Sequence, residues 1–252
     1  MGEEFPFYFW SYPPHALVLS EQLSSLPYRG AFAIWTLCGL GLMFYAARKF
    51  WPDKFSPWLL LLAPSSFVNV FLGQNGFFIT ALALSGFTLL PRRPILAGVM
   101  FGLLTFKPHL GIMIPIALLA IGNWRAIIAA SLTAGLFIGA SVLMYGGDTW
   151  WQFLDSTLPH QMRFMTEGMG PFQRMMPSWL MAGRIIALPL WLAHAVQSAM
   201  ALAAAVMVYR VFRGEGEWHL KIALLFVATL VASSQGSIPK HFDRDSFRGS
   251  PS

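Results

Sequence analysis

The stretch that decides the fold is residues 126–145, which read AIIAASLTAGLFIGASVLMY and contain no charged side chain. The hydrocarbon core of a bilayer is about 30 Å thick, so a helix needs roughly 20 apolar residues to cross it. Arg125 lies directly before this run, and the polar sequence Gly146-Gly147-Asp148 follows it. The run therefore predicts one complete transmembrane helix.

The composition extends this prediction to the whole chain. Of 252 residues, 56% are hydrophobic and 11% are charged, with a formal net charge of +6. A soluble domain carries roughly 25% charged residues, and so apolar a chain is not disordered. No dense Lys/Arg cluster supports a nucleic-acid partner, and the lone Cys38 excludes an intramolecular disulfide or a cysteine zinc site. We predict an all-α polytopic membrane protein that needs neither a metal nor a cofactor.

Polar or Pro/Gly-rich connections divide the chain into about eight candidate transmembrane spans. They cover residues 29–47, 57–72, 77–90, 95–106, 110–121, 126–145, 185–208 and 220–232. The polar stretch from 146 to about 183 forms a long loop between two of them. We therefore predict a membrane core at 28–232, an N-terminal segment at 1–27 and a disordered polar tail at 233–252.

Basic residues gather on alternate connections, and this pattern sets the orientation. One set of connections holds Arg48, Lys49, Lys54, Arg92, Arg93, Arg125, Arg210, Arg213 and Lys221. Because short basic loops stay in the cytoplasm, we predict that this side is cytoplasmic. The long loop and the N-terminal segment then face outward, in a multi-pass protein of the plasma (inner) membrane. The first residues, Met1-Gly2-Glu3-Glu4, have no basic start and no cleavable apolar core, so we expect no signal peptide in them.

The sequence Lys107-Pro108-His109 is the strongest candidate binding site, on the outward side. Its flanking spans are short, so the turn lies below the outer surface. A cation at such depth is costly and points to a function, and neither neighbouring span carries an acidic partner. A lipid-linked phosphate fits both Lys107 and His109. The alternative is a lysine at a helix end that extends its ammonium group to water.

Three further outward segments contribute candidate cavity residues, each with a structural alternative. Tyr12 and His15 flank two prolines beside an aromatic cluster, which also suits an interfacial anchor. Gln74 and Asn75 stand between glycines, as in a wet cavity or in a simple tight turn. Asp148 begins an amphipathic, Trp-rich stretch, where a carboxylate also suits helix capping. Met165, Met169, Met175 and Met176 form an adaptable apolar surface for a lipid chain, or ordinary packing.

Taken in order, these motifs resemble glycosyltransferase family 87, polytopic enzymes of the GT-C superfamily. The resemblance covers about residues 5–232. The motifs that carry it are Tyr12-Pro13-Pro14, Leu26-Pro27-Tyr28, Gly73-Gln74-Asn75-Gly76, Ala97-Gly98, Leu103-Leu104-Thr105-Phe106-Lys107-Pro108-His109 and Tyr145-Gly146-Gly147-Asp148 with Trp151 and Phe153. It implies transfer of a hexose, often mannose, from a polyprenyl-phosphate sugar to a lipid or glycan acceptor on the outer face, with inversion. It also implies a GT-C-like helical bundle whose partners are these substrates and membrane lipids.

This sequence departs from the family pattern at the catalytic base. The resemblance places an acidic residue upstream of the Tyr-Pro-Pro motif, and Glu3 and Glu4 lie too close to that motif to match it. The catalytic residue therefore stays unassigned. We expect the chain to be a fragment, with 1–27 a remnant of the first outer loop and a frame change near Ser233 that leaves its activity in doubt.

Two other functions remain open at this point. A transporter or flippase of an anionic lipid-linked substrate would use Lys107 and His109 to bind its cargo, and an inverted repeat would favour it. No convincing repeat relates the two halves. A structural subunit of a membrane complex is also compatible with the low charge of the spans.

Overall fold

A computed structural model describes residues 12–53, 55–167 and 178–233, and within them the secondary structure is helical. Three described helices are long and apolar enough to cross a membrane: α2 (Tyr28–Phe50), α8 (Trp124–Tyr145) and α13 (Leu190–Arg213). The predicted span at 126–145 is thus confirmed as a membrane-spanning candidate, with its start two residues earlier. Trp124 begins α8 and is 61% exposed, as suits an aromatic residue at a membrane interface.

Shorter helices surround these three. Before and after α2 lie η1 (Pro14–Ala16), α1 (Leu17–Ser20), η2 (Glu21–Leu23), α3 (Pro57–Leu61) and α4 (Pro64–Leu72). The central group is α5 (Gly76–Leu89), α6 (Pro94–Leu103), η3 (Leu104–Phe106), η4 (Pro108–Leu110) and α7 (Met113–Ala120). The remainder is α9 (Gly147–Gln152), the π-helical turn η5 (Phe153–Thr157), α10 (Leu158–Glu167), α12 (Trp179–Ile185) and α14 (Trp218–Ala232).

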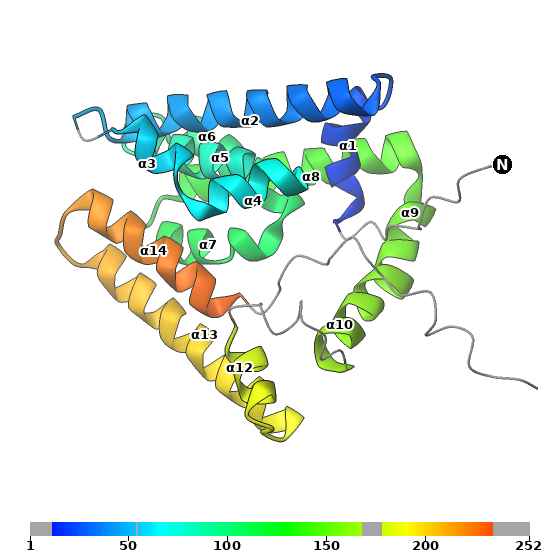
Figure 1. The fold of residues 1–252 in the computed structure, drawn as a ribbon. Helices are drawn as coiled ribbons and strands as arrows, with labels where there is room; N and C mark the ends of the chain where they lie inside the picture. The colour runs from blue at the N-terminus through cyan, green and yellow to red at the C-terminus, as the bar shows by residue number, and fades with distance from the viewer. Residues whose placement is uncertain (1–11, 54, 168–177, 234–252) are drawn as a thin grey trace, which may run out of the picture.

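The central bundle places α2, α5, α6 and α8 side by side (Figure 1). Small residues allow the close packing, because a Cβ on Gly98 or Gly102 would collide with α8. Gly86 of α5 likewise leaves room for the Phe101 ring of α6. These contacts pair Gly98 with Ala126 and Gly102 with Thr133. The helices α6 and α8 therefore run in the same direction. The helix α7, which connects them in the chain, runs the opposite way.

The hairpin of α13 and α14 packs against α7 and completes the bundle. Gln197 in the middle of α13 is 6% exposed. Its side-chain oxygen accepts from the Leu180 amide at 3.2 Å, and its nitrogen donates to the Ala232 carbonyl at 3.0 Å. This one amide satisfies backbone groups at the ends of two neighbouring helices, which would otherwise be costly to bury.

The predicted basic side is one end of this bundle. The end of α2 meets the start of α14, where His219 Nε2 lies 3.0 Å from the Phe50 carbonyl. The turns between α5 and α6, between α7 and α8, and between α13 and α14 lie toward this same end (Figure 1). The basic connections therefore share one end, as an alternating topology requires. The interpretation of this end as cytoplasmic rests on the basic bias alone.

Two predicted spans differ from the structure for reasons visible in the backbone. The span at 57–72 is interrupted at Ala63, which adopts an extended conformation before Pro64. Proline disfavours helical geometry in the residue before it and lacks an amide donor. The span at 185–208 begins later, because Pro189 is the N-cap of α13 and lies outside that helix. The remaining short helices leave the total of eight spans as a prediction.

The stretch predicted as a long loop is mostly helical where it is described. Helices α9 and α10 turn away from the C-terminal end of α8, which lies opposite the basic end (Figure 1). Such a turn fits an amphipathic segment that lies along the membrane interface. The predictions for Met169, Met175 and Met176 lie outside the described residues, as do those for Glu3, Glu4 and the tail, and nothing is described of the side chain of Met165.

Candidate functional site

The site begins at the Gly73-Gln74-Asn75-Gly76 turn, which connects α4 to α5. Gly73 ends α4 with φ +58°, a left-handed conformation that favours glycine. Asn69 of α4 braces the turn by accepting a hydrogen bond from the Gly76 amide at 2.8 Å. A Cβ on Gly76 would collide with this Asn69 side chain. The sequence therefore encodes a fixed turn that holds Asn75 in place.

Asn75 joins two residues that lie far from it in the chain. Its Oδ1 accepts a hydrogen bond from Lys107 Nζ at 3.1 Å, and its side chain also hydrogen-bonds Tyr12. The Lys107 ammonium group lies 5.6 Å from the centre of the Tyr12 ring, within range of a cation–π contact. Asn75 is 7% exposed. Three predicted site residues, Tyr12, Asn75 and Lys107, thus form one polar cluster.

The cluster lies within the bundle, below the end that is opposite the basic end. Gly102 packs beside Thr133, so Lys107, five residues later, is about level with Phe137 of α8. The helix α8 continues to Tyr145, about 12 Å further at 1.5 Å per residue. The prediction of a recessed Lys107 therefore agrees with the helix lengths. At that depth the surroundings are low in dielectric, and a positive charge is costly.

Burial changes the acid–base behaviour of this cluster. It lowers the pKa of Lys107 to about 8, because the charged form loses water. Burial, assisted by the nearby Lys107 charge, lowers the pKa of His109 to about 4. At neutral pH His109 is uncharged and offers a hydrogen bond, whereas Lys107 carries the positive charge. Burial also raises the pKa of Tyr12, which stays a neutral phenol.

His15 lies behind the cluster in an aromatic pocket. Its ring stacks on Trp150 with centroids 5.6 Å apart and meets the Phe137 ring edge-on at 5.0 Å. The ring is 2% exposed, and neither nitrogen makes a hydrogen bond of normal geometry to the described residues. Burial lowers the pKa of His15, and the nearby Thr105 backbone offsets this in part. The structure thus packs His15 as a neutral ring between Phe137 and Trp150.

A cavity of about 510 Å³ adjoins the cluster. Tyr12, Gly73 and Asn75 line its polar end, with Phe106 beside them. Its walls come from α1, η2 and the outer half of α2. Lys107 itself stands behind Tyr12 and Asn75, one contact from the cavity.

Three other predicted site residues do not line this cavity. Gln74 is half-buried beside it, His109 lies on the far side of Pro108, and Asp148 is exposed in the first turn of α9. The roles assigned to them stay predictions. Two side-chain hydrogen bonds at the C-terminal end of α8 were missed from the sequence: Tyr145 donates to Glu21, and Trp150 Nε1 donates to Ser141 at 2.9 Å. The role of Asn69 could have been predicted from the sequence, because a single amide side chain within an apolar helix needs a hydrogen-bond partner.

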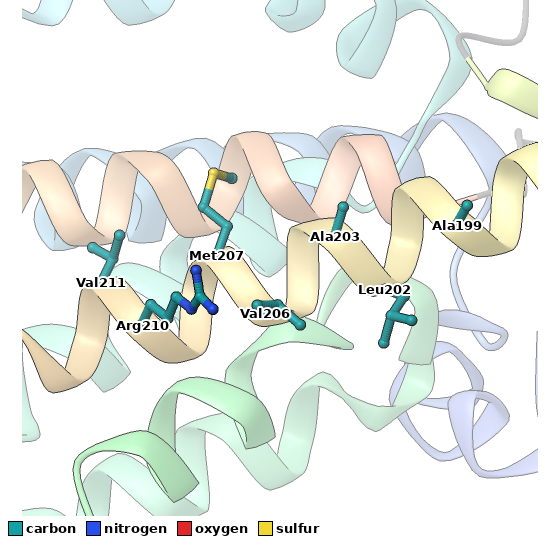
Figure 2. Close-up of a pocket in the computed structure, with 7 residues that line it drawn as sticks. All are labelled: Ala199, Leu202, Ala203, Val206, Met207, Arg210 and Val211. Carbon is teal, nitrogen blue, oxygen red and sulfur yellow. The ribbon is translucent and has the colours of Figure 1, made fainter.

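A second hollow, of about 660 Å³, lies along α13 between Ala199 and Val211 (Figure 2). It is larger than the first, but its lining residues all belong to the exposed face of one helix. Arg210 is its one charged lining residue and lies toward the basic end. Because no second element converges on this hollow, we place the functional site at the Lys107 cluster.

The fold and the site define a helical membrane protein with a recessed polar cluster at the end of an apolar cavity. The family model of glycosyltransferase family 87 matches residues 10–234. The chain therefore belongs to this family and is a membrane glycosyltransferase. No curated protein and no solved structure matches the sequence.

Proposed function

We propose that the protein transfers a hexose, mannose, from a polyprenyl-phosphate sugar to a lipid or glycan acceptor at the outer face of the plasma membrane. The observation that supports this most is Lys107, a half-buried cation that contacts Tyr12 and Asn75 at the polar end of an apolar cavity. Such a cavity suits a substrate with an anionic head and an apolar tail. Family membership supplies the transfer of a sugar.

The charge of Lys107 is not balanced by a carboxylate among the described residues. Among the described residues, the Glu217 carboxylate lies beside His219 at the basic end, 4.0 Å from its Nδ1. An ammonium group has three donors, and Asn75 accepts one of them. The phosphodiester of a lipid-linked sugar supplies both the missing negative charge and further acceptors. Donor binding would therefore supply the remaining hydrogen-bond acceptors and the negative charge that the Lys107 ammonium group needs.

The same contact favours the chemical step. The acceptor hydroxyl oxygen forms a bond to the anomeric carbon as the bond from that carbon to the phosphate oxygen breaks. The bonding electron pair stays on the leaving polyprenyl phosphate, whose charge increases, and the hydroxyl proton passes to a general base. A fixed cation beside the phosphate stabilises this developing charge. Lys107 thus acts on both donor binding and departure.

The proposal is tested with the purified protein in liposomes, given radiolabelled polyprenyl-phosphate mannose and membrane lipids. We expect a new labelled product, and no product from the glucose-bearing donor. Label that crosses the bilayer in unchanged donor would instead show a transporter and overturn the proposal. A product from the glucose donor alone would refute mannose as the sugar.

A further inference from the structure

The cavity has an aromatic wall on α2. Tyr28, Phe32 and Trp35 line it at spacings of four and three residues, which places them on one face of the helix. The Tyr28 and Phe32 rings lie 6.3 Å apart, and Trp35 packs on Phe78 of α5 at 4.4 Å. This aromatic wall therefore runs from the mouth of the cavity toward its polar end.

The opposite wall combines leucines with Ser20 and Ser24. Leu19 of α1 and Leu23 of η2 line the cavity across from α2. Gly73 lies against the aromatic wall, because a Cβ there would lie 3.2 Å from the Phe32 ring. Any larger residue at position 73 would narrow the passage between Phe32 and the Asn75 turn. The chain thus keeps an apolar passage open up to the cluster that holds Lys107.

The mouth of this passage faces the lipid. Tyr28 begins a membrane-spanning helix and is 76% exposed, and Leu26 at the rim is 38% exposed. An apolar chain can therefore enter sideways from the outer leaflet without crossing water. The volume of about 510 Å³ lies within the usual range for small-ligand sites, roughly 300–1,000 Å³. It accommodates a phosphorylated head and a few isoprene units but not a whole polyprenyl chain.

We infer that the aromatic wall of Tyr28, Phe32 and Trp35 binds the isoprene units nearest the phosphate and so contributes to the affinity for the lipid part of the donor. This inference rests on the proposed function and adds the residues that recognise the lipid. Methyl-branched, unsaturated isoprene units bury apolar surface against aromatic rings. Lys107, beyond the polar end of the passage, would hold the phosphate. The isoprene units nearest the phosphate would then lie along the aromatic wall.

The test uses two soluble donors, the mannosyl phosphodiesters of a C10 isoprenol and of ethanol. Wild type should have a much lower KM for the C10 donor. In Phe32→Ala the ratio of the two KM values should fall about 5- to 10-fold, as expected for losing half of a buried ring. The value of kcat should change little. Leu37→Ala is the matched control, because Leu37 is 67% exposed on the same helix and does not line the cavity.

A binding measurement separates this inference from the proposed function. Binding of C10 isoprenyl phosphate and of ethyl phosphate is measured by calorimetry on wild type, Phe32→Ala and Phe32→Leu. Phe32→Leu keeps an apolar side chain and should retain most of the preference for the C10 compound. An unchanged preference in Phe32→Ala overturns the inference even if transfer is observed. A preference that depends on Phe32, without transfer of sugar from any donor, supports the passage and overturns the proposed reaction.

Discussion

Replacing Lys107 with methionine is the substitution that bears most directly on the proposed chemistry. Methionine keeps an unbranched apolar side chain of similar length, so the packing against Tyr12 is largely retained. The change removes the ammonium group and its 3.1 Å hydrogen bond to Asn75. Asn75 keeps its hydrogen bond to Tyr12 and faces the cavity, where water can satisfy its free oxygen. The variant should therefore fold.

The expected loss follows from the charge and its burial. A hydrogen bond between charged partners is worth about 1.5–3 kcal/mol. Two unit charges 4 Å apart attract by about 4 kcal/mol at an effective dielectric constant of 20. Part of this attraction is offset because the phosphate also loses water on binding. A net loss of about 2–3 kcal/mol corresponds to a roughly 30- to 150-fold decrease in kcat/KM for the donor.

The assay measures kcat/KM with radiolabelled polyprenyl-phosphate mannose in liposomes. Lys49→Met is a close control, because Lys49 Nζ lies 5.8 Å from the Tyr45 ring in a similar pair at the basic end. This control should retain wild-type activity. If Lys107→Met also keeps its kcat/KM within about twofold of wild type, the reasoning is refuted.

Other predictions concern the same site and the helix packing. Burial lowers the pKa of Lys107 to about 8, so the ammonium form is lost as pH rises through that value, and kcat/KM should fall above it. Lys107→Arg stays charged, so in a series of assays from pH 6 to 10 its profile should lack this fall. Asn75→Ala frees the ammonium group from its anchor and should raise the donor KM about tenfold, whereas unchanged kinetics would remove Asn75 from the site. Gly98→Val should lower the free energy of unfolding in detergent by about 1–3 kcal/mol, because its side chain collides with α8, while Gly139→Val has open space and should cost less.

Much of the helical framework was predictable from hydropathy. The run at 126–145 is uniform in composition, and the structure extends it by only two residues. The interruption before Pro64 was less visible, because apolar residues continue on both sides of it. Local chain geometry, rather than hydropathy, ends those helices. The boundary at Pro189 differs for the same reason.

The candidate site was predictable residue by residue but not as an assembly. Lys107 stood out because it is a cation without an acidic neighbour, and Asn75 because it is polar between apolar runs. Their contact joins positions 32 residues apart and depends on how α5 packs against α6. No periodicity encodes that register, which is set by contacts such as Gly86 with Phe101. The neutral state of His109 likewise follows from burial that only the fold reveals.

The most direct test of the central claim is a cryo-electron-microscopy structure of the protein with a non-transferable polyprenyl-phosphate sugar analogue. We expect phosphate density within hydrogen-bonding distance of Lys107, about 3 Å from Nζ, and lipid density between Phe32 and Leu23. Phosphate density at Arg210 on α13, with the Lys107 cluster unchanged, would contradict the claim.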